Sequence, residues 1–176
     1  MPDVTTTQKN STFAANYRLM EENVKLSDYC RIITALIIIT IAVALFLTAD
    51  RPPVALTIAA ISMAMLISGL LYAPRRIAVS ATHIIIKSSL RTHRIPLRDV
   101  TAATLYAPTM GAVRILGSSG FMGYWGIFRE GDTGRYAAWY GRASDCFMVR
   151  MVNGDKYVLG CENASEMTDY INSLIS

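Results

Sequence analysis

Two long uncharged segments separated by a very short link restrict what this chain can fold into. Residues 32–49 read IITALIIITIAVALFLTA and residues 54–73 read VALTIAAISMAMLISGLLYA, and neither stretch contains a charged side chain. A helix needs about 20 mostly apolar residues to span a bilayer. The link, Asp50-Arg51-Pro52-Pro53, is too short to cross back over the membrane, and its prolines break a helix. The sequence therefore predicts a transmembrane helical hairpin over residues 31–74.

The flanking charges predict how this hairpin is oriented. Lys25 and Arg31 precede the first helix, Arg75 and Arg76 follow the second, and the link offers only Arg51, beside an acidic residue. Cytoplasmic flanks of membrane helices are enriched in Lys and Arg, so we expect both chain termini on the cytoplasmic side. The first segment follows a polar tail, is long, and has no A-x-A site after it, so a retained helix is favoured over a cleaved signal peptide.

Small residues predict the contact between the two helices, because close packing in lipid depends on them. Neither span contains an ionisable side chain of the kind that marks transporters and proton relays, which favours an anchor; a pore formed by an oligomer stays open. The predicted contact residues are Thr40, Ala44 and Thr48 on the first helix and Ala60, Ala64 and Ser68 on the second.

Residues 1–30 form a polar tail with one patterned stretch. Phe13, Tyr17, Met20 and Val24 recur at helical spacing. Such a pattern predicts a short amphipathic helix. Two placements stay open, on the lipid headgroups or packed against the downstream domain.

Residues 75–176 have the pattern of a small β-rich domain. Short β-branched and aromatic runs alternate with turn residues, and no long helical segment separates them, which predicts an antiparallel sandwich or barrel. Met167, Tyr170, Ile171 and Leu174 then mark one face of a closing helix. The expected strands cover residues 78–79, 82–88, 91–97, 100–105, 113–116, 124–128, 135–140, 147–152 and 156–159. The predicted fold class is α+β, a transmembrane hairpin followed by a β-sandwich or barrel capped by a C-terminal helix.

This arrangement resembles the pleckstrin-homology (PH) fold, in which a C-terminal helix plugs one end of a bent sandwich. The segment IPLRDV (residues 95–100) resembles the strand-to-turn segment of bacterial PH-like membrane proteins. The segment RILGSSGFMGYWGIFREGDTGRYAAWYGR (residues 114–142) is similar to the signature of one such family with two transmembrane helices. The resemblance covers residues 77–174 and the layout of the anchor. It implies a non-enzymatic domain tethered to a bacterial inner membrane, and it supplies no catalytic residues.

Glycines recur at every third position between residues 117 and 126, with large apolar side chains between them. The segment lacks the G-K-[ST] ending and the strand-then-helix context of a phosphate-binding loop. Two interpretations stay open: glycines at a sheet corner with the aromatics in the core, or an exposed apolar contact loop. The candidate contact residues are Phe121, Met122, Tyr124 and Trp125.

Two groups of cations are candidate contacts for anions or lipid headgroups. The net charge of +4 belongs almost entirely to the segment after Pro74. In lipid-binding PH domains, cations of the first hairpin hold the headgroup, and the resemblance of this chain to that pattern is loose. The candidates are Lys87, Arg91 and Arg94 in the first hairpin and Arg114, Arg129 and Arg135 around the glycine-rich segment.

No arrangement of residues indicates catalysis, a metal or a cofactor. His83 and His93 lie in one predicted hairpin without a suitable third ligand, which makes a poor zinc site. The three cysteines, Cys30, Cys146 and Cys161, have no metal-binding spacing, and their odd number argues against a disulfide framework. We expect no enzyme activity and no nucleic-acid partner.

Three functions remain as hypotheses. The first is a membrane-anchored interaction module that binds a protein partner or a second copy of itself. The second is a sensor of anionic lipid headgroups, and the third is an accessory subunit of a transporter or envelope enzyme that uses the helices as its contact. The partner, the lipid, the oligomeric state and the biological process do not follow from the sequence.

Overall fold

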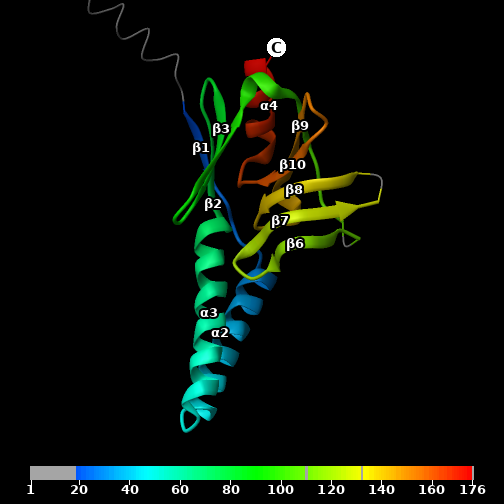
Figure 1. The fold of residues 1–176 in the computed structure, drawn as a ribbon. Coiled ribbons are helices and arrows are strands. Elements are labelled where there is room, and N and C mark those ends of the chain that lie inside the picture. Colours follow the sequence, from blue (N-terminus) through cyan, green and yellow to red (C-terminus); the bar gives the residue numbers. More distant parts are fainter. Residues whose placement is uncertain (1–18, 110, 132, 176) are drawn as a thin grey trace, which may run out of the picture.

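The computed structural model describes residues 19–109, 111–131 and 133–175. Two long helices form a hairpin at one end, and two β-sheets with a third helix form a domain at the other (Figure 1). The helices are α2 (Asp28–Leu47), α3 (Pro52–Tyr72) and α4 (Ala164–Ile175).

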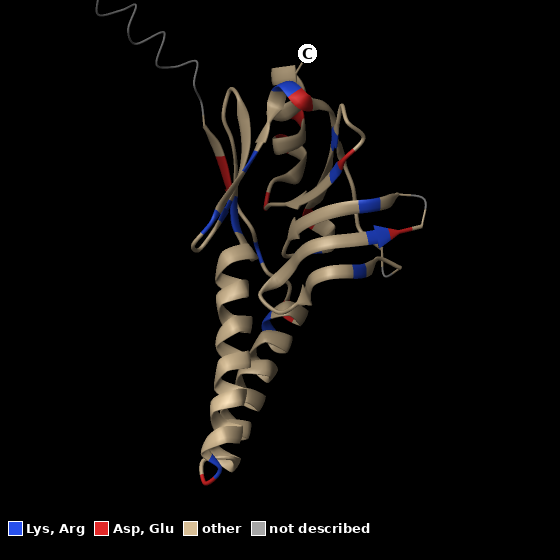
Figure 2. Cartoon of the chain, viewed as in Figure 1, with Lys and Arg blue, Asp and Glu red and all other residues tan. Residues whose placement is uncertain are grey.

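The hairpin helices begin where the local sequence dictates. The Ser27 side chain accepts a hydrogen bond from the Cys30 backbone N–H (3.2 Å) and caps α2, as short hydroxyl side chains do at helix starts. Pro52 and Pro53 occupy the first turn of α3, where a missing N–H costs little. Both helices are long and apolar enough to span a membrane. Figure 2 shows no charged residue along them between the link and the end next to the domain.

The contact between α2 and α3 differs in part from the small residues that were expected. Ala44 and Thr48 are half-buried, but Thr40 is exposed. On α3 the prediction of Ala60 and Ala64 is wrong, since both are exposed, and Ser68 is half-buried. The buried residues of α3 are Ser62 and Gly69, which lie on a different face of the helix from Ala60 and Ala64. The β domain fixes that face, because its β6–β7 turn packs against Gly69.

The first sheet takes its edge strand from the segment before the membrane hairpin. Its order is β1-β2-β3-β4, with every pair antiparallel. Val24 N–H continues the β1–β2 ladder by donating to the Arg75 carbonyl (2.9 Å). The strands are β1 (Met20–Asn23), β2 (Pro74–Val79), β3 (His83–Ser88) and β4 (Thr92–Pro96).

The predicted amphipathic helix of the tail is wrong in the part that the structure describes. Met20 lies in strand β1, and Val24 follows it and packs against the domain core. The spacing of Met20 and Val24 fits a helix. In the structure, however, the backbone N–H and C=O groups of this segment form a ladder of hydrogen bonds with β2. Phe13 and Tyr17 lie outside the described residues.

The second sheet has the order β5-β9-β10-β8-β7-β6. All its pairs are antiparallel except β8 with β10, which are parallel and were not expected to be. Each strand predicted after residue 77 overlaps a strand of the structure. The strands are β5 (Val100–Leu105), β6 (Val113–Gly120), β7 (Gly123–Glu130), β8 (Gly134–Tyr140), β9 (Cys146–Met151) and β10 (Lys156–Gly160). Short 3-10 turns, η1 (Leu97–Asp99) and η2 (Ala143–Asp145), precede β5 and β9.

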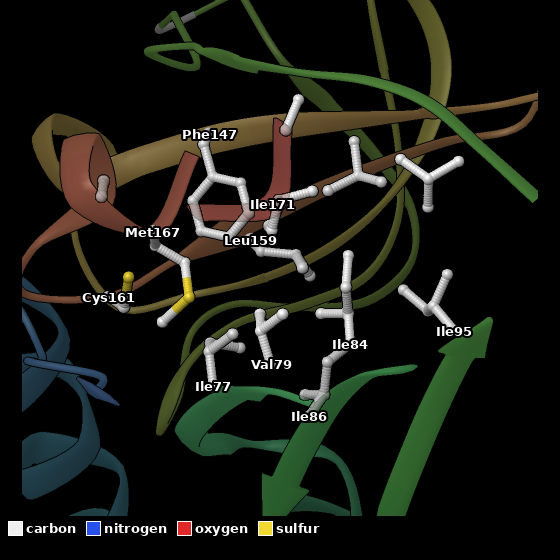
Figure 3. Packing of buried hydrophobic residues seen from close by; sticks show 14 of the residues in the cluster. Ile77, Val79, Ile84, Ile86, Ile95, Phe147, Leu159, Cys161, Met167 and Ile171 are labelled. Atoms are coloured by element: carbon white, nitrogen blue, oxygen red, sulfur yellow. The ribbon is translucent and has the colours of Figure 1, made fainter. Parts of the chain in front are cut away.

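The two sheets pack as a sandwich that does not close into a barrel. Isoleucines and valines of the first sheet meet Phe147 and Leu159 of the second, and Met167 and Ile171 of α4 complete the core (Figure 3). The Asn172 side chain holds α4 against β5, since it accepts from the Ala103 N–H (3.0 Å) and donates to the Ala103 carbonyl (2.9 Å). The predicted capping helix is thereby confirmed.

A buried carboxylate organises the outer end of the second sheet. Glu130 is 8% exposed and makes no ion pair with a described residue. Its oxygens accept from the Tyr106 hydroxyl (2.6 Å), the Thr109 N–H (2.9 Å) and hydroxyl, and the Tyr136 hydroxyl (3.3 Å). Burial alone would raise the pKa of Glu130, but hydrogen bonds from Thr109 and Tyr106 outweigh it, so the pKa lies below its ordinary value.

We expect Glu130→Gln to lower the free energy of unfolding by about 1–3 kcal/mol, because an amide turns donor hydrogens toward groups that need an acceptor. A carboxyl whose pKa is lowered by folding stabilises the protein above its unfolded-state pKa and loses that contribution as pH falls through the folded-state value. The gap between wild type and variant should therefore shrink below about pH 4.5, the ordinary carboxyl pKa. Thermal unfolding in detergent micelles measures both effects.

The matched control is Glu166→Gln, which makes the same change at an exposed position of α4. Equal unfolding temperatures for Glu130→Gln and wild type at neutral pH would contradict the assigned role of the carboxylate.

Candidate functional site

The glycine-rich aromatic hairpin, formed by β6 and β7, packs against the membrane helices of its own chain. Phe121 and Trp125 are 7% and 9% exposed. The Phe121 carbonyl accepts from the Ser118 hydroxyl (3.0 Å) and from the Trp125 indole N–H (3.3 Å), which stiffens the turn. Met122 and Tyr124 are half-buried. The interpretation as an exposed contact loop is therefore wrong for Phe121 and Trp125, and the core interpretation holds for them.

Specific contacts seat this turn between α2 and α3. The Met122 N–H donates to the Thr34 hydroxyl (2.9 Å), which itself donates to the Cys30 carbonyl (2.7 Å) in α2. On the α3 side, a Cβ at Gly69 would lie 2.6 Å from the Met122 sulfur. The Trp125 ring stacks on Tyr72 at the end of α3, with centroids 5.6 Å apart. The β domain thus contacts the second turn of α2 and the last turn of α3.

Two of the glycines allow the strands of this hairpin to approach closely. Gly117 and Gly126 face each other in register, with φ angles of +108° and +119°. A Cβ on Gly126 would lie 2.2 Å from the Leu116 carbonyl oxygen, and one on Gly117 would lie 2.0 Å from the Trp125 carbonyl oxygen. The regular spacing seen in the sequence therefore reflects a backbone requirement rather than a ligand loop.

The three cations of the first hairpin do not converge. Lys87 pairs with Glu21 of β1 (2.8 Å), while Arg94 is exposed on the same outer face of the first sheet. Arg91 lies at the hairpin tip, where its guanidinium donates to the Tyr72 hydroxyl (3.1 Å) and sits 5.3 Å from the centre of that ring. A single headgroup site built from all three is not formed.

The strand register separates the second group of cations. Arg129 and Arg135 are direct cross-strand partners on β7 and β8, so they share one face of the sheet. Arg114 is opposite Phe128 and therefore lies on the other face. All three are exposed, and none makes an ion pair among the described residues.

Arg129 and Arg135 lie on the same face of the second sheet as its core residues. This part of the face extends past the first sheet, which does not cover it. Register places Ile127 opposite Ala137, Trp125 opposite Trp139, and Tyr157 beside Ala137. Figure 1 shows β6, β7 and β8 extending to the side, away from β1–β4. We name this open surface the aromatic shelf; its residues are Ile127, Arg129, Arg135, Ala137, Trp139 and Tyr157.

Stacked rings join the aromatic shelf to the edge strand β4. His93 stacks on Trp139 at 5.2 Å, and Trp139 stacks on Tyr157 at 6.2 Å. Burial lowers the pKa of His93, and the nearby Arg91 acts in the same direction, so the ring is neutral near pH 7. Half-buried aromatics with arginines at the margin are the composition that protein-binding surfaces favour.

Two hollows lie along this surface. One of about 520 Å³ is lined by Arg135, Lys156 and Tyr157 among others, and a smaller one of about 170 Å³ lies between Tyr72, Arg91 and Trp139. Lys156 donates to the Thr133 carbonyl (2.6 Å), and Asp155 is the acidic residue of the larger hollow.

His93, Trp139 and Tyr157 were not identified as site residues from the sequence. The alternation Arg135, Ala137, Trp139 already placed a cation and an aromatic on one face of a strand. The sequence did not predict the parallel pairing of β8 with β10, which places Tyr157 beside Ala137 on the same face.

The histidines do not meet across their hairpin. His83 pairs with Pro96 and His93 pairs with Ile86, which places them at different rungs and on opposite faces of the sheet. Within the described residues, no group of three or more His, Cys, Asp or Glu could hold a metal ion. Cys30, Cys146 and Cys161 are free and buried, and burial raises the pKa of the Cys146 and Cys161 thiols, the latter to about 12.

Comparison with known families gives one match. A family model described as Bacterial PH domain matches residues 75–175, more than half of the chain. Neither the curated proteins nor the solved structures include one that matches this chain. Strand β1 and the membrane hairpin lie before the matched region.

We expect Gly126→Ala to unfold or loosen the β6–β7 hairpin, because a methyl group at this φ would clash with the carbonyl of Leu116. Tryptophan fluorescence reports it, since the stack of Trp125 on Tyr72 would be lost, and thermal unfolding should shift to lower temperature. Gly131→Ala is the control, because a Cβ there meets nothing within 4 Å. Similar spectra and stability for the two variants would contradict the close-approach requirement.

Proposed function

The chain belongs to the Bacterial PH domain family, and on that premise we propose a membrane-anchored, non-catalytic interaction module. Its aromatic shelf binds an acidic segment of a protein partner at the membrane surface. The hairpin holds the module at the bilayer, so that a weak intrinsic affinity suffices because both partners are confined to one surface.

One observation carries this proposal: Arg129 and Arg135 face each other across β7 and β8, and neither makes an ion pair with a described residue, although Asp155 lines the same hollow as Arg135. Two like charges in direct register destabilise a sheet. An acidic group bound between them would relieve that repulsion and form charge-assisted hydrogen bonds. The aromatic side chains beside them supply apolar area with little loss of conformational freedom on binding.

The position of the aromatic shelf suits a partner that is also at the membrane. Its inner end lies beside Tyr72, which ends α3, because Tyr72 and Trp139 line one hollow. Its outer end lies along β7 and β8 away from the two long helices (Figure 1). Strand β4, which contains His93, is one of the two edge strands of the first sheet. An extended acidic segment laid along the aromatic shelf would therefore have both side-chain contacts and an open strand edge within reach.

A lipid contact is the second candidate, and the tip of the β3–β4 hairpin favours it. Leu90 is 66% exposed, and its N–H donates to the Leu70 carbonyl of α3 (3.1 Å). An apolar side chain with Arg91 beside it, held against a membrane helix, would meet headgroups. Lys87 and Arg94 lie on another face, so this contact anchors the tip and does not form a headgroup pocket.

Photo-crosslinking in cells tests the protein partner. With a benzophenone amino acid at Ala137, we expect a discrete protein adduct that Arg129→Glu with Arg135→Glu reduces at least tenfold. The same amino acid at Ser165, an exposed position of α4, is the matched control and should give no such adduct. A lipid adduct from position 137 would favour the headgroup sensor. An adduct indifferent to charge reversal would refute the role of the two arginines.

We further propose that the protein lies in the bacterial inner membrane, with both termini and the β domain in the cytoplasm. Lys25, Arg31, Arg75 and Arg76 flank the domain end of the hairpin, against Arg51 at the link. The three native cysteines are buried and give little background labelling.

Cysteine labelling checks this orientation. An impermeant maleimide should label Asp50→Cys in intact spheroplasts and should label Ser165→Cys only after permeabilisation. The reverse pattern would show that the domain faces the other side. Both positions are exposed, so a difference between them reports the side of the membrane and not burial.

A further inference from the structure

A second cavity lies on the face of the second sheet opposite the aromatic shelf. It has a volume of about 460 Å³ and is formed by strands β6–β8, the first turn of α2, the segment after β5 and η2. The Tyr124 and Tyr140 rings stack at 4.7 Å along its wall. Tyr29 of α2 lines it on the side of the membrane helices. It lies apart from the surface proposed above to bind a protein partner.

The lining of this cavity is uncharged. Its described residues supply aromatic rings, small apolar groups and the hydroxyls of Tyr29, Thr109, Ser119, Tyr124 and Tyr140, and none of them is Lys, Arg, Asp or Glu. An ionised group entering such a site would lose its hydration without gaining an opposite charge. The lining therefore fits an uncharged ligand that carries carbonyl or hydroxyl oxygens.

The Tyr140 hydroxyl is the polar group of this cavity that could bind a ligand. It is 3% exposed and lines the cavity, yet no hydrogen bond joins its hydroxyl to a described residue. The neighbouring Tyr106 and Tyr136 differ, since both donate to Glu130. Burial, the largest cause, raises the pKa of Tyr140, so the hydroxyl keeps its proton and can act as a donor. Among the described residues no fully buried side-chain nitrogen or oxygen lacks a hydrogen-bond partner, so the unbonded Tyr140 hydroxyl keeps some accessible surface, and we place it at the cavity wall, where it can donate to a ligand oxygen.

The cavity lies where α2 enters the membrane. Tyr29 is in the first turn of α2 and is 56% exposed. A Cβ at Gly120 would touch both Tyr29 and Ile33 (3.4 Å each), so the end of β6 borders the helix at this depth. Tyrosines at this level are typical of the lipid–water interface. A headgroup could therefore enter the cavity while its acyl chains remain in the bilayer.

We propose that this cavity binds the headgroup of an uncharged glycerolipid, of diacylglycerol chemistry, taken from the leaflet that faces the β domain. The Tyr140 hydroxyl donates to a ligand oxygen, and the stacked tyrosines cover the glycerol carbons. A cavity of this volume is within the usual range of small-ligand sites, roughly 300–1,000 Å³.

Photoaffinity labelling of the full chain tests the proposal. The protein is placed in phosphatidylcholine nanodiscs that contain a diacylglycerol with a diazirine close to its glycerol, and the labelled peptides are identified by mass spectrometry. We expect adducts at Pro108, Thr109 or Ala112 and on β7. Excess dioleoylglycerol should compete for them, and excess phosphatidylglycerol should not.

Variants separate this site from general membrane contact. Tyr140→Phe keeps the ring stack and should lower labelling about fivefold, the effect of losing one neutral hydrogen bond. Tyr157→Phe makes the same change on the aromatic shelf and should leave labelling unchanged. Ala143→Trp, at an exposed position that lines the cavity, should block entry without disturbing the core, as thermal unfolding would verify.

Three results would overturn the proposal: equal labelling of Tyr140→Phe and wild type, equal competition by phosphatidylglycerol, or adducts confined to the outward faces of α2 and α3. None of them bears on the aromatic shelf, so this site and the protein-binding surface are tested separately.

Discussion

The antiparallel pairing of β1 with β2 is the contact on which the rest of the structure depends. These strands are neighbours in the sheet, yet the entire membrane hairpin lies between them in the chain. Both ends of the hairpin therefore leave the domain from adjacent positions of one ladder, and a backbone hydrogen bond from Val24 to Arg75 extends it to the base of the helices. A hairpin attached through one flexible linker would let the domain turn freely. Attachment through two paired strands restricts it.

The fixed geometry explains how the aromatic residues divide their roles. Phe121, Met122 and Trp125 pack on the helices because the β6–β7 turn must fill the gap between Thr34 of α2 and Gly69 of α3. The other aromatic residues of β7, β8 and β10 lie on the two faces of the second sheet, in chemically different surroundings. One face combines rings with two arginines that make no ion pair among the described residues, and the cavity on the other face is lined, among the described residues, by rings, hydroxyls and small apolar groups. A single sheet held above a membrane can thus present a surface to an acidic protein segment and a cavity to a neutral lipid.

Electrostatics keep these two faces distinct. Glu130, the buried acid next to the cavity, is fully engaged by hydroxyls and a backbone N–H, so its charge is neutralised locally by donors instead of by a cation. Arg129 projects from the neighbouring position to the opposite face, since successive strand residues alternate. Exposed charges separated by more than a Debye length, about 8 Å at physiological salt, interact weakly. A partner on the aromatic shelf would accordingly respond to Arg129 and Arg135, and a ligand in the cavity would respond to the hydroxyl of Tyr140.

Sequence periodicity determined much of this protein, because the hydrophobic patterns of membrane helices, short strands and the α4 helix are local. The uncharged spans and the Pro-Pro link predicted the hairpin, and alternation with turn residues predicted the positions of the strands after residue 77. Tertiary structure decided everything that depends on pairing. Met20 and Val24 have helical spacing but lie in and beside a strand, because β2 offers that segment a ladder. The face of α3 that packs is set by Met122, distant in the chain. The aromatic shelf forms because β8 and β10 pair in parallel. Trp125 is buried because its ring packs against Tyr72 of α3. The spacing of residues along the chain determines which side chains share a face of a helix or strand, because that geometry is local. Which other segment covers that face depends on the pairing of strands that are distant in the sequence, so only the tertiary structure decides it.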